Sequence, residues 1–341
     1  MGSDHDADRS SGSPSTPDLE IRRATHDDYD DVRSFTEGIW TDRGGDYLPD
    51  VYHDWIEGEG GVEAGETPKK TFVADLEGTV VGIVQAVLLS SDEAWLQGMR
   101  VDPAHRRKGV SWRLNEACFE WCREREATLA RLMVFSWNAA GLGVSRAIGA
   151  EPITEVRWVH PDPDSDAEGP LPVSSDPTAA WRHWTHSEAR DELRGLGLDL
   201  EQSWALREVT RADLERQADE AAVFAVEGDD GLSGMAYRSR VYERSSGGGD
   251  DEHGDDGDGQ DDAGSAEPTT WAEYGVAAWD DVDAARSLFA AISRDAAVVG
   301  ADETRVMIPE TVGYVSDASY AGVEIGDEPA FVLGVDLAGT Q

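Results

Sequence analysis

Apolar and polar residues follow one another along residues 19–101 in a pattern that predicts a strand, a helix and three further strands. The first strand starts at Leu19, and Thr25 offers a side-chain cap for a helix that runs to about Gly38. An irregular, aromatic-rich stretch follows at 44–58, and its pattern does not decide whether a second helix forms there. Three strand-like runs joined by short polar turns then follow, at 71–75, 80–89 and 94–101. This part of the chain is therefore expected to form an antiparallel meander.

Helical spacing returns after this meander, with apolar residues at i, i+3, i+4, i+7 and i+8 from Leu114. A strand at 129–135, a helix at 140–148 and a strand at 153–159 complete the first unit. A linker at 161–200, with a helix at 177–194, precedes a second run of the same elements. The pattern predicts a duplicated α/β (α+β) fold, with a mixed, mostly antiparallel sheet flanked by helices. Its two domains are expected at 19–160 and 201–341, without a readable repeat of sequence.

Two segments are too polar to pack. Residues 1–18 are small, polar and Pro-containing, and residues 245–268 contain no branched aliphatic or aromatic side chain. We expect a disordered tail and a disordered acidic insertion between two strands. The insertion lacks the spacing of oxygen ligands that calcium loops have, so no metal site is expected.

The strongly negative net charge of the chain argues against some classes of function, nucleic-acid binding above all. The chain of 341 residues carries 70 acidic and 29 basic residues, a formal net charge of −41. Acids spread along the whole chain are typical of halophilic proteins, although such a surface also attracts cationic partners such as polyamines. Nucleic acid is not expected as a ligand, because phosphate binding needs a basic face. The chain has no apolar run long enough to span a membrane, and we expect it to be cytoplasmic.

The two cysteines are expected to lie in the core. Cys118 and Cys122 stand four residues apart within a helical pattern. A disulfide within one helix has poor geometry, and two thiols are too few for a structural zinc site.

Three consecutive basic residues stand in one loop, which lies between a strand and a helix. A helix N-terminus leaves backbone N–H groups unpaired and attracts anions, and a glycine lets the backbone approach a phosphate closely. The segment therefore predicts a pyrophosphate site, against the alternative of an ordinary basic turn. Its residues are Arg106, Arg107, Lys108, Gly109, Val110 and Ser111.

The segment Arg106-x-x-Gly109-x-Ser111, after the strand WLQGMRV, resembles the acetyl-CoA loop of the GNAT acetyltransferases, whose pattern is [RQ]xxGx[GA]. The resemblance covers about residues 19–160. It implies that the amides of 107–111 hold the pyrophosphate and that Met99 and Val101 pair with the pantetheine arm of acetyl-CoA. Asn138 matches an Asn that contacts the cofactor in the family, with a helix cap as its alternative role.

Two departures from the family pattern leave the acid and the base open. Ser145 stands where the family often has a Tyr that acts as the general acid. Ser145, water or another Tyr would therefore protonate the leaving thiolate of CoA. Gln97 stands where many relatives have a Glu that acts as the general base. Glu93 and Asp92, at the start of the same strand, are candidate bases through a water, with a plain hairpin charge as the alternative role of each.

A narrower resemblance, carried by GGDYLPDVYHDWI and QGMRVDPAHRRKGVS, is to the vertebrate histidine N-acetyltransferases, which also carry a second GNAT-like half. It implies that Asp46, Tyr47, Tyr52 and His53 line or support the pocket of the amine acceptor. The alternative is a local aromatic core beneath a loop.

In the second unit, acids occupy the place of the phosphate loop, at 279–283, so this unit is expected not to bind acetyl-CoA. It would cover the first unit, close its pocket or form a surface for a homodimer. The expected function is transfer of an acetyl group from acetyl-CoA to a small-molecule amine or amino acid. A non-catalytic acyl-CoA-binding or regulatory protein and a protein N-terminal acetyltransferase remain alternatives.

Overall fold

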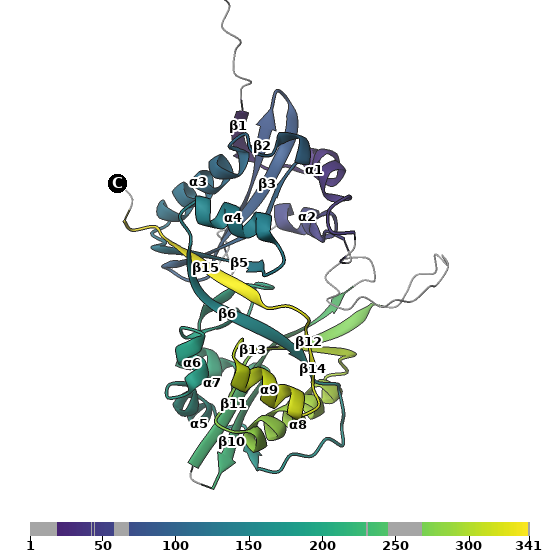
Figure 1. Ribbon diagram of the computed structural model, residues 1–341, viewed down its shortest axis with the longest axis vertical. Helices are drawn as coiled ribbons and strands as arrows, with labels where there is room; N and C mark the ends of the chain where they lie inside the picture. Colours follow the sequence, from purple (N-terminus) through teal and green to yellow (C-terminus); the bar gives the residue numbers. More distant parts are fainter. Residues whose placement is uncertain are drawn as a thin grey trace, which may run out of the picture.

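A mixed sheet of 13 strands runs through both halves of the chain in the computed structural model (Figure 1). The structure describes residues 19–41, 43, 45–57, 68–229, 231–244 and 268–339. The tail predicted at 1–18 and the insertion predicted at 245–268 lie outside these residues, except for Pro268. Within the described part, no helix is both long and apolar enough to cross a membrane.

The first half follows the predicted order, and the stretch left open at 44–58 contains a helix, α2. Two further short elements are 3-10 turns, at His26–Asp28 and Pro103–His105. The strands and helices are β1 (Leu19–Arg23), α1 (Tyr29–Thr36), α2 (Leu48–Glu57), β2 (Lys69–Leu76), β3 (Thr79–Leu88), β4 (Glu93–Val101), α3 (Val110–Arg123), β5 (Leu129–Phe135), α4 (Ala139–Ala147) and β6 (Glu151–His160).

The second half repeats this order after a linker. The helix predicted at 177–194 is two helices, because Thr185 ends the first and Ser187 caps the second. The elements are β7 (Val173–Ser174), α5 (Pro177–Trp184), α6 (Glu188–Glu192), β8 (Leu196–Leu198), β9 (Leu206–Glu208), α7 (Arg211–Glu220), β10 (Ala222–Gly228), β11 (Gly231–Arg244), β12 (Thr269–Trp279), α8 (Val282–Val298), β13 (Glu303–Pro309), α9 (Val312–Tyr320), β14 (Glu324–Ile325) and β15 (Ala330–Asp336).

The two halves exchange their last strands. The sheet order is β1-β2-β3-β4-β5-β15-β6-β13-β12-β11-β10-β7, so β15 lies between β5 and β6 (Figure 1). In β15, Leu333 faces Leu132 of β5, while β6 continues to β13 through the pair Val159 and Val306. The last strand of each half therefore completes the sheet of the other, and the halves share one hydrogen-bonded sheet.

A short sequence repeat marks the duplication, although the sequence analysis found none. Arg22-x-x-Thr25-x-x-Asp28 recurs as Arg207-x-x-Thr210-x-x-Asp213. In both copies the Arg guanidinium donates two hydrogen bonds to the Asp carboxylate, and that carboxylate accepts the backbone N–H of the Thr at 2.8 Å. The expectation of no readable repeat is therefore wrong at this motif.

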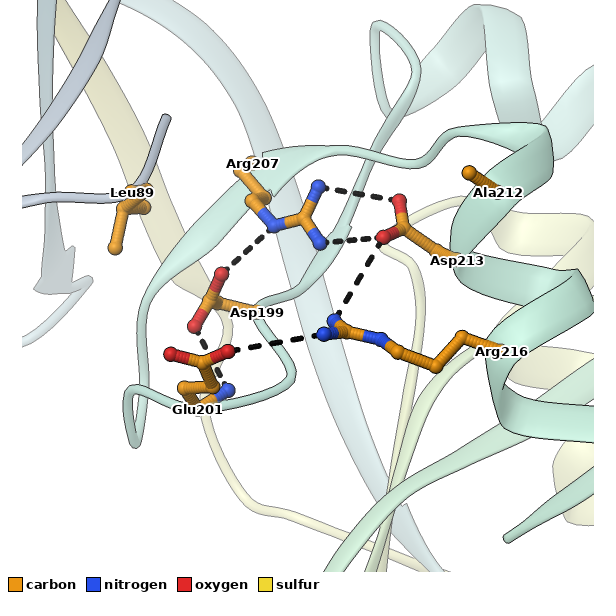
Figure 2. Close-up of a pocket in the computed structure, with 7 residues that line it drawn as sticks. All are labelled: Leu89, Asp199, Glu201, Arg207, Ala212, Asp213 and Arg216. Atoms are coloured by element: carbon orange, nitrogen blue, oxygen red, sulfur yellow. Dashed lines mark hydrogen bonds and ion pairs between the residues drawn. The ribbon is translucent and has the colours of Figure 1, made fainter. Parts of the chain in front are cut away.

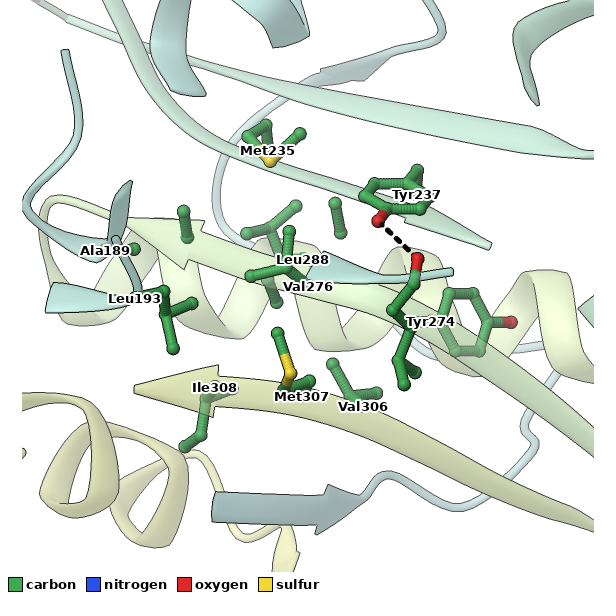
Figure 3. Close-up of a cluster of buried hydrophobic side chains, with 14 of the residues drawn as sticks. Ala189, Leu193, Met235, Tyr237, Tyr274, Val276, Leu288, Val306, Met307 and Ile308 are labelled. Atoms are coloured by element: carbon green, nitrogen blue, oxygen red, sulfur yellow. Dashed lines mark hydrogen bonds between the residues drawn. The ribbon is translucent and has the colours of Figure 1, made fainter. Parts of the chain in front are cut away.

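Hydrophobic packing holds the helices on both faces of the sheet. Val73 of β2 packs with α1 and α2, whereas its neighbours Phe72 and Ala74 pack on the opposite face with α3. In the second half a larger core gathers around α8, β11, β12 and β13, and Figure 3 shows Met235, Val276 and Leu288 within it. Cys118 and Cys122 are fully buried, as predicted.

Candidate active site

Strands β4 and β5 open into a V, and this opening positions the site. The two strands are parallel but pair only where Glu93–Trp95 of β4 lie beside Leu129–Arg131 of β5. Strand β4 continues to Val101 without a strand partner on that side in the described part of the chain. There the carbonyls of Met99 and Val101 accept hydrogen bonds from the side chains of Arg100 and Arg106, at 3.1 and 3.3 Å, and not from a neighbouring strand. An extended ligand could add here like a further strand by replacing these side-chain contacts.

A bulge at Gly98 shapes this segment of β4. The register with β3 slips between the pairs Gln85–Gln97 and Ile83–Arg100, and Gly98 has φ +65°. A Cβ at Gly98 would overlap the ring of Trp55 on α2. Glycine is therefore required both by the left-handed conformation and by the close approach of the tryptophan.

The predicted phosphate loop leads from the open end of β4 into α3. Arg107 and Gly109 have φ values of +62° and +82°, and the side chains of Arg106, Arg107 and Lys108 are exposed. Arg106 Nε donates to the carbonyl of Val101 at 3.3 Å, which ties the loop back to the strand. Three cationic side chains and the first amides of α3 thus stand at one end of the V.

Asp102 fixes the turn before this loop. Its carboxylate accepts the N–H of Ala104 at 2.9 Å and lies 2.7 Å from Nδ1 of His105. Burial acts to raise the pKa of Asp102, but these hydrogen bonds outweigh it and the pKa is lowered. The turn is therefore held by an ionised side chain at neutral pH.

Asn138 and Ser145 lie on α4, which follows β5. The Asn138 side chain accepts the N–H of Gly141 at 2.9 Å, so the capping role is present. The Ser145 hydroxyl is buried and donates to the carbonyl of Gly141 at 2.9 Å. The proton of Ser145 is thus already engaged with the helix backbone, and its role as an acid stays a prediction.

Glu93 forms a buried ion pair with Arg131 of β5 at the closed end of the V. It precedes Met99 by six residues, about 20 Å along an extended strand. A general base must lie within hydrogen-bond reach of its proton, directly or through one water. The second half has a comparable buried pair, Glu273 with Arg305, across its parallel strands β12 and β13. This geometry favours a structural role for Glu93 over the predicted catalytic one.

The residues predicted at the acceptor pocket separate into two groups. Asp46 is fully buried and paired with Arg100 of β4, and Tyr47 lies beside the same guanidinium. Tyr52 is a core residue whose hydroxyl donates to the carbonyl of Thr25 at 2.6 Å. His53 is exposed and lies against His26 and Tyr29. Of these four predicted residues, Asp46 and Tyr47 contact the Arg100 side chain of β4, and the local-core alternative describes Tyr52.

Several residues around the V were missed by the sequence analysis. Arg100 lies over the Trp40 ring at 4.2 Å, Trp40 contacts the Trp137 ring edge-on, and Arg43 lies over Trp137 at 4.4 Å. Glu328, from the segment before β15, is 3.7 Å from Arg43. Single aromatic and charged residues of this kind carry no motif, so only the fold brings them together.

Between β12 and α8, where every residue is described, the second half has no comparable phosphate loop. Only two residues separate β12 from α8, and the carboxylate of the second, Asp281, accepts the N–H of Ala284 at 2.8 Å. Trp279, at the end of β12, packs against Tyr314 and Phe289. A carboxylate therefore already occupies the anion position at this helix start, as the acids at 279–283 predicted.

The second half also contains a charged cavity of about 410 Å³, with Leu89 of the first half at one side (Figure 2). Arg207 binds Asp199 and Asp213 at 2.7 and 2.6 Å, and Arg216 lies 3.7 Å from Glu201. Arg22 makes the same contacts with Asp28 and Asp75 in the first half. The cavity thus surrounds the repeated Arg–Asp motif, whose charges bind one another. In the described chain, no group of three or more His, Cys, Asp or Glu side chains is placed to hold a metal ion.

Comparisons with known proteins show what the chain is similar to. Residues 29–149 match the acetyltransferase (GNAT) family. The histidine N-acetyltransferase of Xenopus tropicalis is 27% identical over 197 residues, 55% of this chain and 58% of that protein. The chain therefore spans less than two thirds of the length of this curated relative.

Two solved structures share the fold across both halves. A tandem GNAT protein from the clavulanic acid biosynthesis pathway aligns with 95% of this chain and 100% of its own, at TM-score 0.51 and 14% identity. The GCN5-related glucosamine N-acetyltransferase region of a fungal GH3 β-N-acetylglucosaminidase aligns with 94% of this chain and 38% of its own, at TM-score 0.57 and 14% identity. Residues 29–149 are thus similar to the GNAT acetyltransferases, and over nearly its whole length the chain has the fold of tandem GNAT proteins.

Proposed function

We propose that the chain transfers an acetyl group from acetyl-CoA to the primary amine of a small molecule. The observation that carries the proposal is the V between β4 and β5, which ends at the basic loop of residues 106–111. An extended pantetheine arm needs a strand edge without a partner strand, and a pyrophosphate needs amides and cations beyond it. In the first half, the open strand edge of β4 is followed directly by the basic loop. The second half has a carboxylate at the equivalent helix start.

The loop residues fit a pyrophosphate. An added Cβ at Gly109 would meet no atom within 4 Å, so the space beside its backbone is open. The amides of 107–111 and the side chains of Arg106, Arg107 and Lys108 would hold the phosphates. Met99 and Val101 would hydrogen-bond the pantetheine arm of acetyl-CoA through their backbone.

The protein's part in the transfer is positioning and charge stabilisation. The acceptor ammonium first loses a proton to solvent water, and the neutral amine then attacks the thioester carbonyl directly, with a backbone N–H of the Met99–Val101 segment donating to the developing oxyanion. The C–N bond forms as the C–S bond breaks, CoA leaves as the thiolate, and the second amine proton passes to that thiolate or to water. A thiolate leaves readily at neutral pH, so the transfer does not depend on a strong acid at Ser145. Glu93 keeps the role of a candidate base only if its ion pair with Arg131 opens.

An amino acid is the proposed acceptor. The relative from Xenopus tropicalis is named for histidine, and the described residues beside the V include both a cation, Arg43, and an anion, Glu328. A zwitterion offers one partner to each. Aromatic rings of Trp40 and Trp137 beside them would pack against a flat side chain.

The test is product formation, measured by mass spectrometry, from acetyl-CoA with L-histidine, other amino acids and polyamines in high-potassium buffer. We expect an N-acetylated amino acid. A non-catalytic acyl-CoA-binding protein is the second candidate, favoured by the engaged Ser145 hydroxyl and the Glu93–Arg131 pair. It predicts that acetyl-CoA binds while none of the amines is acetylated. Acetylation of peptide N-termini alone would favour a protein N-terminal acetyltransferase instead.

A further inference from the structure

Strand β15 brings residues of the second half to the open end of the V. Strand β15 lies beside β5 (Figure 1), and its Ala330 pairs with Phe135, the last residue of β5. The backbone N–H of Ser136 donates to the carbonyl of Pro329 at 3.0 Å, and the Ser136 hydroxyl donates to Oε2 of Glu328 at 2.5 Å. Glu328 is therefore held at the end of β5 by two neighbouring contacts, although it lies 192 residues from Ser136 in the sequence.

Glu328 lies at the same level of the sheet as the open part of β4. Leu129 of β5 is paired with Glu93 of β4, and the strands run parallel. Ser136 and Arg100 are each seven residues further along their strands from this pair. The Glu328 carboxylate, which accepts a hydrogen bond from the Ser136 hydroxyl, is thus level with the segment of β4 on which we place the reacting end of acetyl-CoA.

The side chains between these two strands form a continuous series. From β4 outward it runs through Arg100, Trp40, Trp137 and Arg43 to Glu328. The guanidinium groups of Arg100 and Arg43 lie 4.2 and 4.4 Å from the ring centroids of Trp40 and Trp137, respectively. The two ring centroids are 5.3 Å apart, and Arg43 is 3.7 Å from the Glu328 carboxylate. The series combines the segment between α1 and α2 with β4, the end of β5 and the segment before β15. The first half supplies all of these residues except the carboxylate at the end.

The charges of this series are not equally available. Arg100 is committed to Asp46, and both side chains are at least nine-tenths buried. The side chains of Arg43 and Glu328 are 42% and 36% exposed, and their 3.7 Å contact is that of a loose ion pair. Such exposed pairs contribute little to stability, so a ligand can replace either partner at little cost.

We propose that Glu328 binds the ammonium group of the acceptor, so that the second half supplies a specificity-determining residue to the transfer site of the first. Arg43 then binds the carboxylate of the same acceptor. The inference rests on the proposed function. It gives the degenerate half a defined role, because the exchanged strand β15 is what positions this carboxylate.

Steady-state kinetics of Glu328→Gln test the inference, with Asp327→Asn as the matched control. Asp327 is exposed, neighbours Glu328 and loses the same charge when substituted. For Glu328→Gln we expect the KM for the amino acid to rise at least tenfold, with kcat changed less and the Kd for acetyl-CoA within twofold of wild type. Glu328→Asp is expected to have an intermediate KM, and Asp327→Asn a wild-type KM.

A second acceptor separates the two ends of the ligand. Arg43→Gln should raise the KM for L-histidine but not for histamine, which has no carboxylate, whereas Glu328→Gln should raise the KM for both. An unchanged KM in Glu328→Gln, in an enzyme that turns over, overturns this inference alone. A parallel loss of acetyl-CoA binding in Glu328→Gln also overturns it, because the residue would then support the cofactor site.

Direct titration keeps the inference testable without turnover. L-histidine is titrated into the CoA-bound wild type and into CoA-bound Glu328→Gln. Weaker binding to the variant is expected, and equal binding overturns the inference. Absence of acetyl transfer together with retained, Glu328-dependent binding of L-histidine contradicts the proposed function but supports the binding role of Glu328. If the CoA-bound wild type binds no L-histidine and acetylates none of the amines tested, both proposals are overturned.

Discussion

The guanidinium of Arg100 donates two hydrogen bonds to the carboxylate of Asp46, at 2.6 and 3.1 Å, and the Asp46 side chain is fully buried. The same carboxylate accepts the N–H of Leu48 at the start of α2. One buried acid therefore fixes the segment before α2 to the open part of β4. This contact places Tyr47 and Trp40 beside the V.

Removing one partner of this pair should be costly. We expect Asp46→Asn to lower the free energy of unfolding by about 3 to 5 kcal/mol, because Arg100 is left as a buried charge without its counterion. Urea denaturation followed by fluorescence measures the change. The double variant Asp46→Asn with Arg100→Met should recover part of the loss. A change below about 1 kcal/mol in Asp46→Asn would show that the pair is not a buried anchor.

Gly98 should not tolerate a side chain. In Gly98→Ala the new Cβ overlaps the Trp55 ring, and the residue must also keep φ +65°. Gly78→Ala is the matched control, because Gly78 has φ +87° but no atom within 4 Å of an added Cβ. The control should lose about 1 to 2 kcal/mol from backbone strain alone. Gly98→Ala should melt at a lower temperature than the control and lose acetyl transfer; equal melting temperatures would contradict the contact with Trp55.

The repeated Arg–Asp motif should make stability depend on pH in acid. Burial acts to raise the pKa of Asp28 and of Asp213, but hydrogen bonds from Arg22 and Thr25, and from Arg207 and Thr210, outweigh it and lower both. A folded pKa below the unfolded one stabilises the fold above about pH 4, and this stability is lost as the pH falls through the folded pKa.

Unfolding measured between pH 2 and 7 tests this motif. Asp28→Asn should lower the free energy of unfolding at pH 7 by about 1.5 to 3 kcal/mol and flatten its decline below pH 4. Asp27→Asn, an exposed neighbour, serves as the control and should follow the wild type. An Asp28→Asn curve parallel to wild type in acid would refute a lowered pKa at Asp28.

Both thiols should be unreactive in the folded chain. Burial raises the pKa of Cys122 to about 12 and that of Cys118 well above its usual value. At pH 8 neither is a thiolate, so we expect almost no reaction with Ellman's reagent under native conditions and two thiols per chain in denaturant. Rapid native labelling would show that α3 opens locally.

Much of the fold could be predicted, because each element carries its own local signal. The nearly continuous apolar run between Thr79 and Leu88 and the one-sided apolar face of α3 are readable without knowledge of the partners. The exchange of β6 and β15 is not, since alternation defines which face of a strand is buried but not which strand lies beside it. The Arg-x-x-Thr-x-x-Asp repeat was readable and was missed, because only three of its seven positions are identical.

The candidate site likewise contains residues that could be predicted from the sequence and residues that could not. The loop at 106–111 is contiguous, so its glycine and basic residues form a motif in the sequence. Glu328 and Ser136 are brought together only by the exchanged strand, and Glu93 gained its partner Arg131 only through the parallel pairing of β4 and β5. Contacts between distant strands leave no local pattern, which is why the predicted cofactor residues cluster while the predicted catalytic ones do not.

Calorimetric titration of acetyl-CoA in high-potassium buffer, into the wild type, Gly109→Glu and Gly300→Glu, tests the central claim most directly. Gly300 has φ +71° and open space around an added Cβ, so its variant carries the same backbone strain and the same added charge in the second half. The account predicts that the wild type and Gly300→Glu bind acetyl-CoA and that Gly109→Glu does not. Equal binding by all three, or no binding by the folded wild type, would contradict a cofactor site at residues 106–111.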